Sequence, residues 1–471
     1  MKLLKKAVSL ALALSVWAAS LAGLELTSIT AGASTNSSKV HIWDGTADTL
    51  WFTNDKDTYE IYTPEQLAGL AELVNKGKHE DFFSGVTINL MSDIVLNDTT
   101  NWQSWVDTPP KNKWEPIGSS NQSLVSVNGG GLHPFSGLFN GNGHMISGLY
   151  CKSVKYGWSR NTSIGLFDYI QGAVIGNLKI EKSVVLGQGD GSAGVLAAAS
   201  ENCYIDSVEI KDVIVSSGVH TGGIVGRITR LDYTVIFANI LLAAAGVFIN
   251  PLLYIDQINE YKGTVINNCK VSNADLRPDP GDTNWGDYRV GALTGSMSGG
   301  GVVNSLSENC TMNIGYNKRD YRKYFFGAIT GGQYLVGDQD YVIQNCYTHN
   351  FQMINKDAKQ QDASLVTTLS KNEYLSQSLV NKLGKGFTSV TNGTPVITSL
   401  KDVTLNEIII PGDFDNSGKL ELLDIVNFAK AYANQTALDY RTFHASDIDG
   451  NGKLNLSDIQ GLAISYAKIL G

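Results

Sequence analysis

Two acid-rich loops near the end of the chain carry the clearest chemical signal. They occupy residues 413–424 and 447–458, an offset of 34 residues. Each loop has an oxygen-bearing side chain at its first, third, fifth and twelfth positions. Oxygens at these positions, together with the backbone carbonyl of the seventh residue, can coordinate one calcium ion. The expected calcium ligands are Asp413, Asp415, Ser417, Lys419 and Asp424, then Asp447, Asp449, Asn451, Lys453 and Asp458, with both lysines acting through their carbonyls. The sequence therefore predicts two bound calcium ions.

The same apolar pattern follows each loop. Apolar residues recur at i, i+3, i+4 and i+7, which is one face of a helix. They are Ile425, Phe428, Ala429 and Tyr432, then Ile459, Leu462, Ala463 and Tyr466. Each unit is thus a loop followed by a helix, and we expect the two helices to pack together. A solvated acidic turn is the alternative, and two copies in register argue against it.

The duplicated loop–helix pair, at about residues 409–471, resembles the type I dockerin family. The resemblance implies a small calcium-folded module that docks onto a cohesin domain of a scaffolding protein, as in cellulosomes. In that family the two residues before the closing Asp help to choose the partner. Here they are Leu422-Leu423 and Leu456-Ser457, which differ from the Ser-Thr pair of many members.

Composition and the N-terminal residues narrow the class of protein. The net charge of −9 argues against a nucleic-acid partner. Three lysines within the first six residues precede an apolar run from Ala7 to Ala22. This pattern is typical of a secretory signal peptide, here residues 1–33, and predicts an extracellular protein associated with a scaffold or cell surface. An uncleaved anchor is the alternative.

Five cysteines are widely spaced through the middle of the chain. They are Cys151, Cys203, Cys269, Cys310 and Cys346. The odd count argues against a disulfide framework, and no Cys-x-x-Cys pair suggests zinc. We expect these cysteines to act as small buried hydrophobic residues.

A short glycine motif repeats between residues 130 and 360. A small or apolar residue, Gly and two more apolar residues recur at Gly137, Gly165, Gly194, Gly223, Gly291 and Gly327. The first four are 28–29 residues apart. Such a period, with β-branched runs and glycine turns, predicts a mainly β solenoid with parallel sheets, in which Asn at a fixed turn position stacks as a ladder. An irregular β-sandwich is the competing fold.

Residues 40–400 also resemble the GLUG-repeat family of bacterial secreted and surface proteins. The matching motifs include Trp43-Asp-Gly45, Trp114-Glu-Pro116-Ile117-Gly118 and Phe139-Asn-Gly141-Asn142-Gly143. The resemblance implies a right-handed parallel β-helix, often found in adhesins or in non-catalytic parts of larger proteins. The solenoid is expected over 34–400, followed by a short linker at 401–408.

Two helix-start signals flank the repeats. Thr63-Pro64-Glu65-Gln66 predicts a helix to about Asn75, and Ser370 with Glu373 forms a capping-box candidate. We expect these helices to cap the solenoid.

Between the repeats lies an insertion at about 228–262, whose apolar stretch 235–255 is long enough to span a bilayer. After a cleaved signal peptide, one span would leave the C-terminal module in the cytoplasm and would place Arg227 and Arg230 on the extracellular side, against the positive-inside rule. A helix packed on the solenoid is therefore favoured over membrane contact.

No sequence motif identifies catalytic residues. The best acid–aromatic loop contains Asp275, Asp279, Asp282, Trp285, Asp287 and Tyr288, and a solvated loop is the simpler interpretation. Trp102, Trp105 and Trp114 could stack on sugars, and Lys318-Arg319-Asp-Tyr-Arg322-Lys323 could suit an anionic glycan. The favoured function is a secreted, cellulosome-type component in polysaccharide degradation, with a solenoid that binds polysaccharide or surface ligands. The alternatives are a glycoside hydrolase or polysaccharide lyase, and a non-catalytic adhesin or spacer.

Overall fold

The computed structural model describes the chain from residue 40 onward, with gaps. The described residues are 40–77, 82–119, 133–153, 163–188, 191–229, 264–279, 287–313, 324–332, 341–354, 359–384, 386–389, 392–398, 412–414, 420–434, 442, 445–446, 448 and 454–469. The expected signal peptide, the apolar stretch 235–255 and the linker 401–408 lie outside them. Within the described ranges, no helix is both long and apolar enough to cross a membrane.

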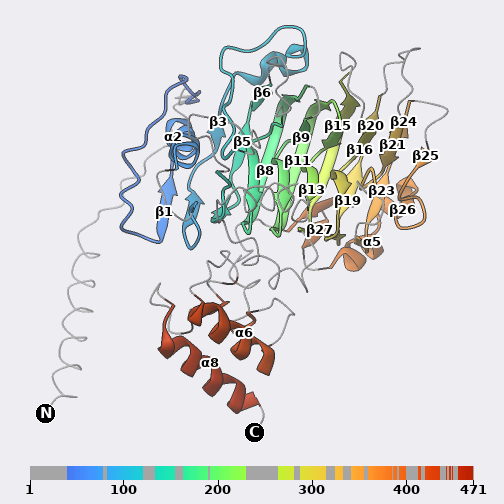
Figure 1. Cartoon of the computed structure of the whole chain (residues 1–471). Coiled ribbons are helices and arrows are strands. Elements are labelled where there is room, and N and C mark those ends of the chain that lie inside the picture. The colour runs from blue at the N-terminus through green and yellow to red at the C-terminus, as the bar shows by residue number, and fades with distance from the viewer. Residues whose placement is uncertain are drawn as a thin grey trace, which may run out of the picture. The chain divides into compact units, whose positions relative to one another are not determined.

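In the described part of the chain the fold is mainly β, with three parallel sheets (Figure 1). The first, of 17 strands, contains β1 (Thr58–Ile61), β2 (Thr87–Leu90), β3 (Ile94–Val95), β4 (Leu138–Asn140), β5 (Met145–Ser147), β6 (Tyr150–Lys152), β8 (Val174–Leu186), β11 (Tyr204–Ser217), β14 (Val265–Asn267), β15 (Lys270–Pro278), β18 (Gly301–Val303), β19 (Leu306–Glu308), β20 (Thr311–Met312), β22 (Val342–Gln344), β23 (Tyr347–His349), β24 (Gln352–Met353) and β26 (Thr367–Leu369). The second contains β7 (Phe167–Gln171), β10 (Ala197–Glu201), β13 (Val225–Thr229) and β17 (Thr294–Met297). The third contains β9 (Ser192–Gly194), β12 (His220–Gly222), β16 (Tyr288–Gly291), β21 (Tyr324–Gly327) and β25 (Lys359–Gln360). Since sandwich sheets are antiparallel, these parallel pairings argue against the β-sandwich alternative.

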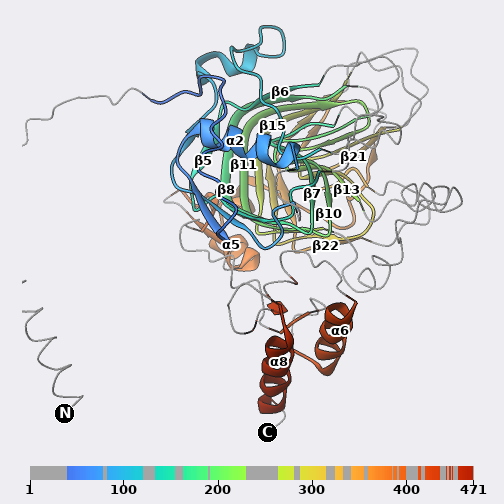
Figure 2. The same ribbon diagram turned by 60° about the vertical axis from the view of Figure 1, so that its left-hand side comes forward.

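Consecutive strands visit the three sheets in a fixed order. From β7 to β21 the chain passes through the second, first and third sheets and then starts again. Each strand therefore pairs with its equivalent from the previous round, as β11 does with β8 and β10 with β7 (Figures 1 and 2). This arrangement stacks equivalent positions of the repeat on one another.

The repeated glycine marks the turn from the third sheet to the second. Gly194, Gly222, Gly291 and Gly327 are aligned in register. A Cβ at these positions would lie 2.2, 2.0, 2.1 and 1.6 Å from the carbonyl oxygen three residues later, so only glycine fits. The motif thus has a steric cause. At one turn the aligned residue is Gly222, and the prediction that chose Gly223 was wrong by one residue.

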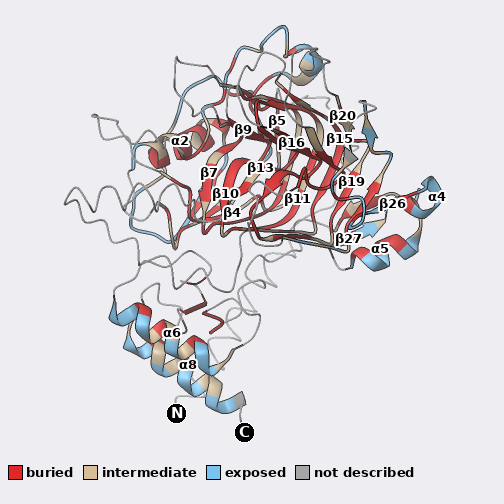
Figure 3. Cartoon of the chain, turned by 45° about the vertical axis from the view of Figure 1, so that its right-hand side comes forward, coloured by how far each residue is buried: buried red, intermediate tan, exposed pale blue. Residues whose placement is uncertain are grey.

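Aliphatic side chains fill the space between the sheets. Ile175, Ile205, Ile266 and Val302 occupy one aligned position in four strands, and all are fully buried. Figure 3 shows buried residues following the strands from end to end of the stack. Like therefore stacks on like, which is how a repeat that cannot bury its own apolar face acquires a continuous core.

All five cysteines belong to buried positions. None forms a disulfide. Burial raises the pKa of Cys310 and Cys346 to about 12, so these thiols stay protonated. The prediction of small buried hydrophobic residues is confirmed.

Side-chain amides form the expected ladder along one corner of the stack. Asn345 Nδ2 donates to Asn304 Oδ1 (2.7 Å), Asn304 Nδ2 to Asn267 Oδ1 (2.9 Å), and Asn267 Nδ2 to Asp206 Oδ2 (2.6 Å). Asn304 and Asn345 have φ of +47° and +54°, a conformation that Asn adopts more readily than most residues. A second ladder joins Asn350, Asn309, Asn273 and Asp212.

A carboxylate completes the last turn between the third and second sheets. In the preceding round, the Leu293 N–H donates to Ile329 O of the next round (3.0 Å). At the final turn, Asp362 accepts from the N–H groups of Ala328 (3.0 Å), Ile329 (2.7 Å) and Thr330 (3.0 Å). The fully buried Asp362 therefore replaces the carbonyl oxygens that a further round would supply.

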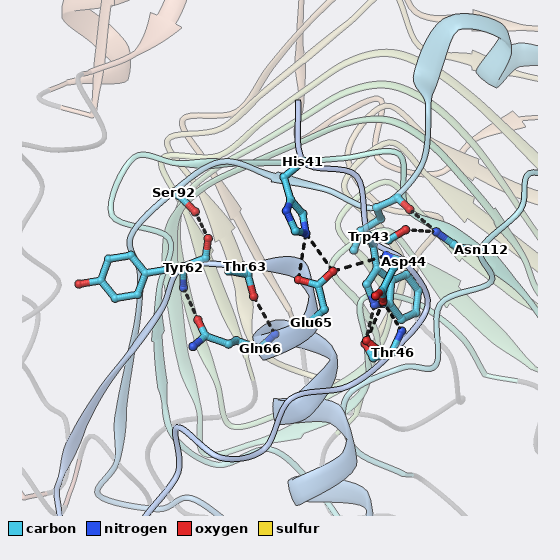
Figure 4. Close-up of polar contacts among 11 residues, drawn as sticks. His41, Trp43, Asp44, Thr46, Tyr62, Thr63, Glu65, Gln66, Ser92 and Asn112 are labelled. Carbon is cyan, nitrogen blue, oxygen red and sulfur yellow. Dashed lines mark hydrogen bonds and ion pairs between the residues drawn. The ribbon is translucent and has the colours of Figure 1, made fainter. Parts of the chain in front are cut away.

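The N-terminal helix begins as predicted. α2 (Pro64–Asn75) has Thr63 as its N-cap, and the Gln66 N–H donates to Thr63 Oγ1 (3.3 Å; Figure 4). Glu65 in the first turn accepts from His41 Nε2 at 3.0 and 3.1 Å, which holds the preceding segment on the helix. The buried face of α2 joins the main core, and the helix lies across the end of the stacked strands (Figure 2).

The second predicted helix start also forms. Ser370 and Glu373 make the capping box of α4 (Lys371–Tyr374), which α5 (Gln377–Leu383) and the antiparallel pair β27 (Phe387–Ser389) and β28 (Pro395–Ile397) follow. These elements form a separate core over outward-facing side chains of β19 and β23. Lys270, 3% exposed, anchors them by donating to Tyr374 Oη (3.3 Å) and Pro395 O (2.8 Å) while pairing with Glu308 (2.9 Å).

Candidate metal and partner-binding module

The two C-terminal helices begin in the same way. α6 (Leu422–Ala433) and α8 (Leu456–Ile469) each carry an Asp at their third residue, Asp424 in α6 and Asp458 in α8. The Glu421 N–H donates to Asp424 Oδ2 (2.6 Å), and the Asn455 N–H donates to Asp458 Oδ2 (2.9 Å). A carboxylate in this position also interacts favourably with the helix dipole. The closing Asp of each loop is thus fixed by its own helix.

These carboxylates are turned away from solvent. Asp413, Asp424 and Asp458 are 1%, 0% and 0% exposed. Asp458 Oδ1 also accepts from the Ile448 N–H (3.0 Å), which ties the second loop to its helix. Burying a carboxylate is unfavourable unless hydrogen bonds, a cation or a metal compensates. The burial of three in so small a module suits a cation site.

The helices share one small core. Four pairs of its members are related by the offset of 34 residues: Phe414 and Ile448, Leu420 and Leu454, Ile425 and Ile459, Phe428 and Leu462. Phe414 stacks on Phe428 with ring centroids 5.7 Å apart. The duplication seen in the sequence is therefore repeated in the packing.

The predicted apolar stripe is correct at its start and wrong at its end. Phe428 and Leu462 are buried, and Ile425 and Ile459 pack beside them. Tyr432 is 39% exposed and Ala463 is exposed. In α6 the buried residue of the last turn is Ala431, because the core is too narrow for a full helix face.

The four predicted partner-binding residues lie on the surface. Leu422, Leu423 and Leu456 are 59%, 44% and 61% exposed, and Ser457 is exposed. Val426, one turn beyond Leu422, is 40% exposed and adds to the same apolar face of α6. Figure 3 shows the exposed sides of both helices. Sequence reasoning missed Val426, which an i, i+4 relation to Leu422 could have identified.

Most predicted calcium ligands fall outside the described residues. These are Asp415, Ser417, Lys419, Asp447, Asp449, Asn451 and Lys453. In the described part of the chain, no group of three or more His, Cys, Asp or Glu side chains could hold a metal ion. The ligand sets and the two calcium ions therefore stay predictions.

The acid–aromatic loop of the strand region is only partly described. Asp282 and Trp285 lie outside the described residues, as does the basic segment 318–323. Asp275 forms an ion pair with Arg277 (2.7 Å), and Tyr288 stacks on Tyr324 with centroids 5.2 Å apart. Of the three candidate tryptophans, Trp105 and Trp114 are buried and Trp102 is partly exposed.

A buried polar cluster between the second and third sheets was not predicted. Tyr169 Oη donates to Glu201 Oε2 (2.6 Å), and Ser296 Oγ hydrogen-bonds to His220 Nδ1 (2.9 Å). Burial, Arg227 and Arg289 lower the pKa of His220 well below its usual value, so the ring is neutral. The members of each pair are 32 and 76 residues apart, and only the strand register brings them together.

Comparisons with known proteins identify no family. No family model matches the chain, and no curated protein matches it. Among solved structures the chain is similar to one described as "a putative immunoglobulin A1 protease from Bacteroides ovatus", with a TM-score of 0.35 and 16% identity, covering 73% of this chain and 92% of that one. At this TM-score the similarity supports no conclusion about fold or function.

Proposed function

We propose that this protein is a secreted component of a cellulosome-type, polysaccharide-degrading complex, which docks to a cohesin through a calcium-dependent dockerin module. The observation that carries the proposal is the matched pair of helix starts, in which Asp424 and Asp458 make the same hydrogen bond at positions 34 residues apart. The symmetric core and the exposed Leu422, Leu423 and Leu456 support it.

The strand region would be a right-handed parallel β-helix that binds polysaccharide or surface ligands. The repeating order of sheets, the in-register glycines and the amide ladders support the β-helix. Such a stack offers long outward-facing rows of side chains, and repeat proteins use surfaces of this kind for binding.

The docking proposal is tested by calorimetric titration of the full mature chain with a panel of cohesins, in calcium and in chelator. We expect binding to at least one cohesin in calcium and none in chelator. Replacing Leu422, Leu423, Leu456 and Ser457 together by Asp should abolish binding without unfolding the module, because all four side chains are exposed.

Ile464→Asp is the matched control, because Ile464 is 57% exposed on α8 but lies two turns from the helix start. It should bind like the wild type. Wild-type affinity in the quadruple variant, or binding that survives chelation, would overturn the docking proposal. Incubating the same protein with polysaccharides and assaying released products tests the hydrolase or lyase alternative.

A further inference from the structure

One outward-facing row of side chains crosses six neighbouring strands of the first sheet. It consists of Tyr150, Val184, Ile214, Asp275, Thr311 and Gln352, each in register with the next. The strands that carry it, from β6 to β24, follow one another along one side of the stack (Figure 1). Neighbouring strands are about 4.8 Å apart, so the row presents one side chain at each such interval.

Aromatic side chains cover the first half of the row. The segment that follows η1 (Thr99–Ser104) places Trp105 edge-on against Tyr150, with centroids 6.2 Å apart. Val184 and Ile214 complete this cluster, and Trp102 packs against it while staying partly exposed. Trp102 therefore keeps part of its indole ring in solvent beside this cluster.

The second half is polar and open. Asp275 lies one strand beyond Ile214, and Arg277 points the same way two residues later. Their side chains are 37% and 31% exposed and form the 2.7 Å ion pair. Burial raises the pKa of Asp275 even though Arg277 lowers it. Thr311 and Gln352 continue the polar row.

The ion pair leaves hydrogen-bonding capacity unused. Asp275 Oδ1 and Arg277 Nε are both shielded from solvent, and neither has a hydrogen-bond partner in the structure as described. A hydroxyl group can donate to this acceptor and accept from this donor, and because both atoms are shielded it reaches them only when the exposed parts of the two side chains move aside. The opposite charges cancel, so the pair gives no preference for an anionic ligand.

We propose that this row binds a neutral polysaccharide, with a sugar ring stacked on Trp102 and its hydroxyls bonded to Asp275 and Arg277. A sugar ring has an apolar face for the indole and hydroxyls for the ion pair, whereas a purely apolar partner would leave the pair unsatisfied. The inference rests on the proposed glycan-binding role of the strand region and assigns its site. It does not depend on docking to a cohesin.

The test is affinity electrophoresis of the full mature chain in calcium, through gels containing xylan, glucomannan, mixed-linkage β-glucan or polygalacturonate. We expect retardation by at least one of the three neutral polymers. Trp102→Ala and Asp275→Ala should each raise the dissociation constant about tenfold or more, the size expected for one lost stacking or charged hydrogen-bond contact. Tyr62→Ala is the matched control, because Tyr62 is a 50% exposed aromatic residue on the N-terminal segment, and it should bind like the wild type.

Thermal unfolding of each variant shows whether it is folded, and Arg277→Gln gives a second test of the ion pair should Asp275→Ala unfold. Retardation of the wild type that none of these substitutions weakens would overturn this site and leave the glycan-binding role standing. Retardation by polygalacturonate alone would overturn the neutral class. No retardation in any gel would overturn both the site and the glycan-binding role of the strand region.

Discussion

The strand region and the C-terminal helix pair compensate buried polar groups in different ways. In the strand region each round supplies partners for the previous one, as the ladder from Asp206 to Asn345 shows, and Asp362 supplies them where the rounds end. In the helix pair, Asp413, Asp424 and Asp458 are buried beside a small core, of which nine residues belong to the described part of the chain. The comparison leads us to expect that a bound cation stabilises the helix pair and not the strand region.

The difference in core size leads to the same conclusion. Among the described residues, one core cluster includes side chains from Trp43 to Val366. Domains as small as the helix pair bury too little apolar surface to fold robustly without a metal, a disulfide or a partner. A bound ion would therefore contribute a large share of the folding free energy of the helix pair and almost none of that of the strand region.

Chelation provides the largest expected effect. In calorimetry of the full mature chain, we expect two unfolding transitions in calcium, of which chelator removes the smaller and leaves the larger unchanged. At a calcium concentration of about 1,000 Kd, the ion contributes about 4 kcal/mol to the folded state. Asp458→Ala should act like chelator, because it removes both the predicted ligand and the bond to the Ile448 N–H.

A chelator-insensitive smaller transition would contradict the dependence of the helix pair on calcium. Val426→Ala is a suitable control for the helix pair, because Val426 is 40% exposed and takes no part in either loop. It should leave both transitions in place.

Removing the terminal carboxylate should give the next largest effect, now in the strand region. Asp362→Ala leaves three buried N–H groups without acceptors, at about 1–3 kcal/mol each. We expect the strand region to lose on the order of 4 kcal/mol in urea unfolding, with calcium binding unaffected. Asp362→Asn keeps one acceptor oxygen and should fall between Asp362→Ala and the wild type.

The exposed Asp107→Ala is the control and should change stability by less than about 0.5 kcal/mol. Equal stability of Asp362→Ala and Asp107→Ala would mean that the last round needs no substitute for its missing neighbour.

Breaking the amide ladder in its middle should have a smaller effect. Asn304→Gly removes two side-chain hydrogen bonds of about 1 kcal/mol each but tolerates the φ of +47°. Asn304→Ala adds the strain of an Ala at positive φ, about 1 kcal/mol more. Urea unfolding should therefore rank the wild type first, the Gly variant second and the Ala variant last. A Gly variant as stable as the wild type would show that the ladder contributes nothing.

Local signals in the sequence predicted much of this molecule, and contacts between rounds could not be read from it. Thr63 and Gln66 identified α2 to its last residue. The Asn ladder forms, but it passes from Asn304 to Asn267, whereas the residue aligned with Asn304 is Asn268. Because Gly222 and Gly223 are adjacent, the sequence motif placed the repeated glycine one residue too late at this turn. The strand order repeats from one round to the next, but the residues between β13 and β14 interrupt the spacing of the repeat in the sequence. The sequence therefore could not place Ser296 beside His220 or Glu308 beside Lys270.

The smallest expected effect is a pH dependence of the stability of the strand region, caused by His220. Burial, Arg227 and Arg289 hold its pKa well below 6.5, so the folded ring stays neutral while the unfolded one takes up a proton below about pH 6.5. The unfolded state then binds more protons, and the strand region should lose up to about 1.4 kcal/mol per pH unit from this residue as the pH falls below 6.5.

His220→Gln should lack this component, so the stability difference between variant and wild type should be constant above pH 7 and shift in favour of the variant between pH 6.5 and 5. Urea unfolding of the strand region at pH 7.5, 6.0 and 5.0 measures it. A pH-independent difference between His220→Gln and the wild type would show that the buried ring accepts its proton in the folded state.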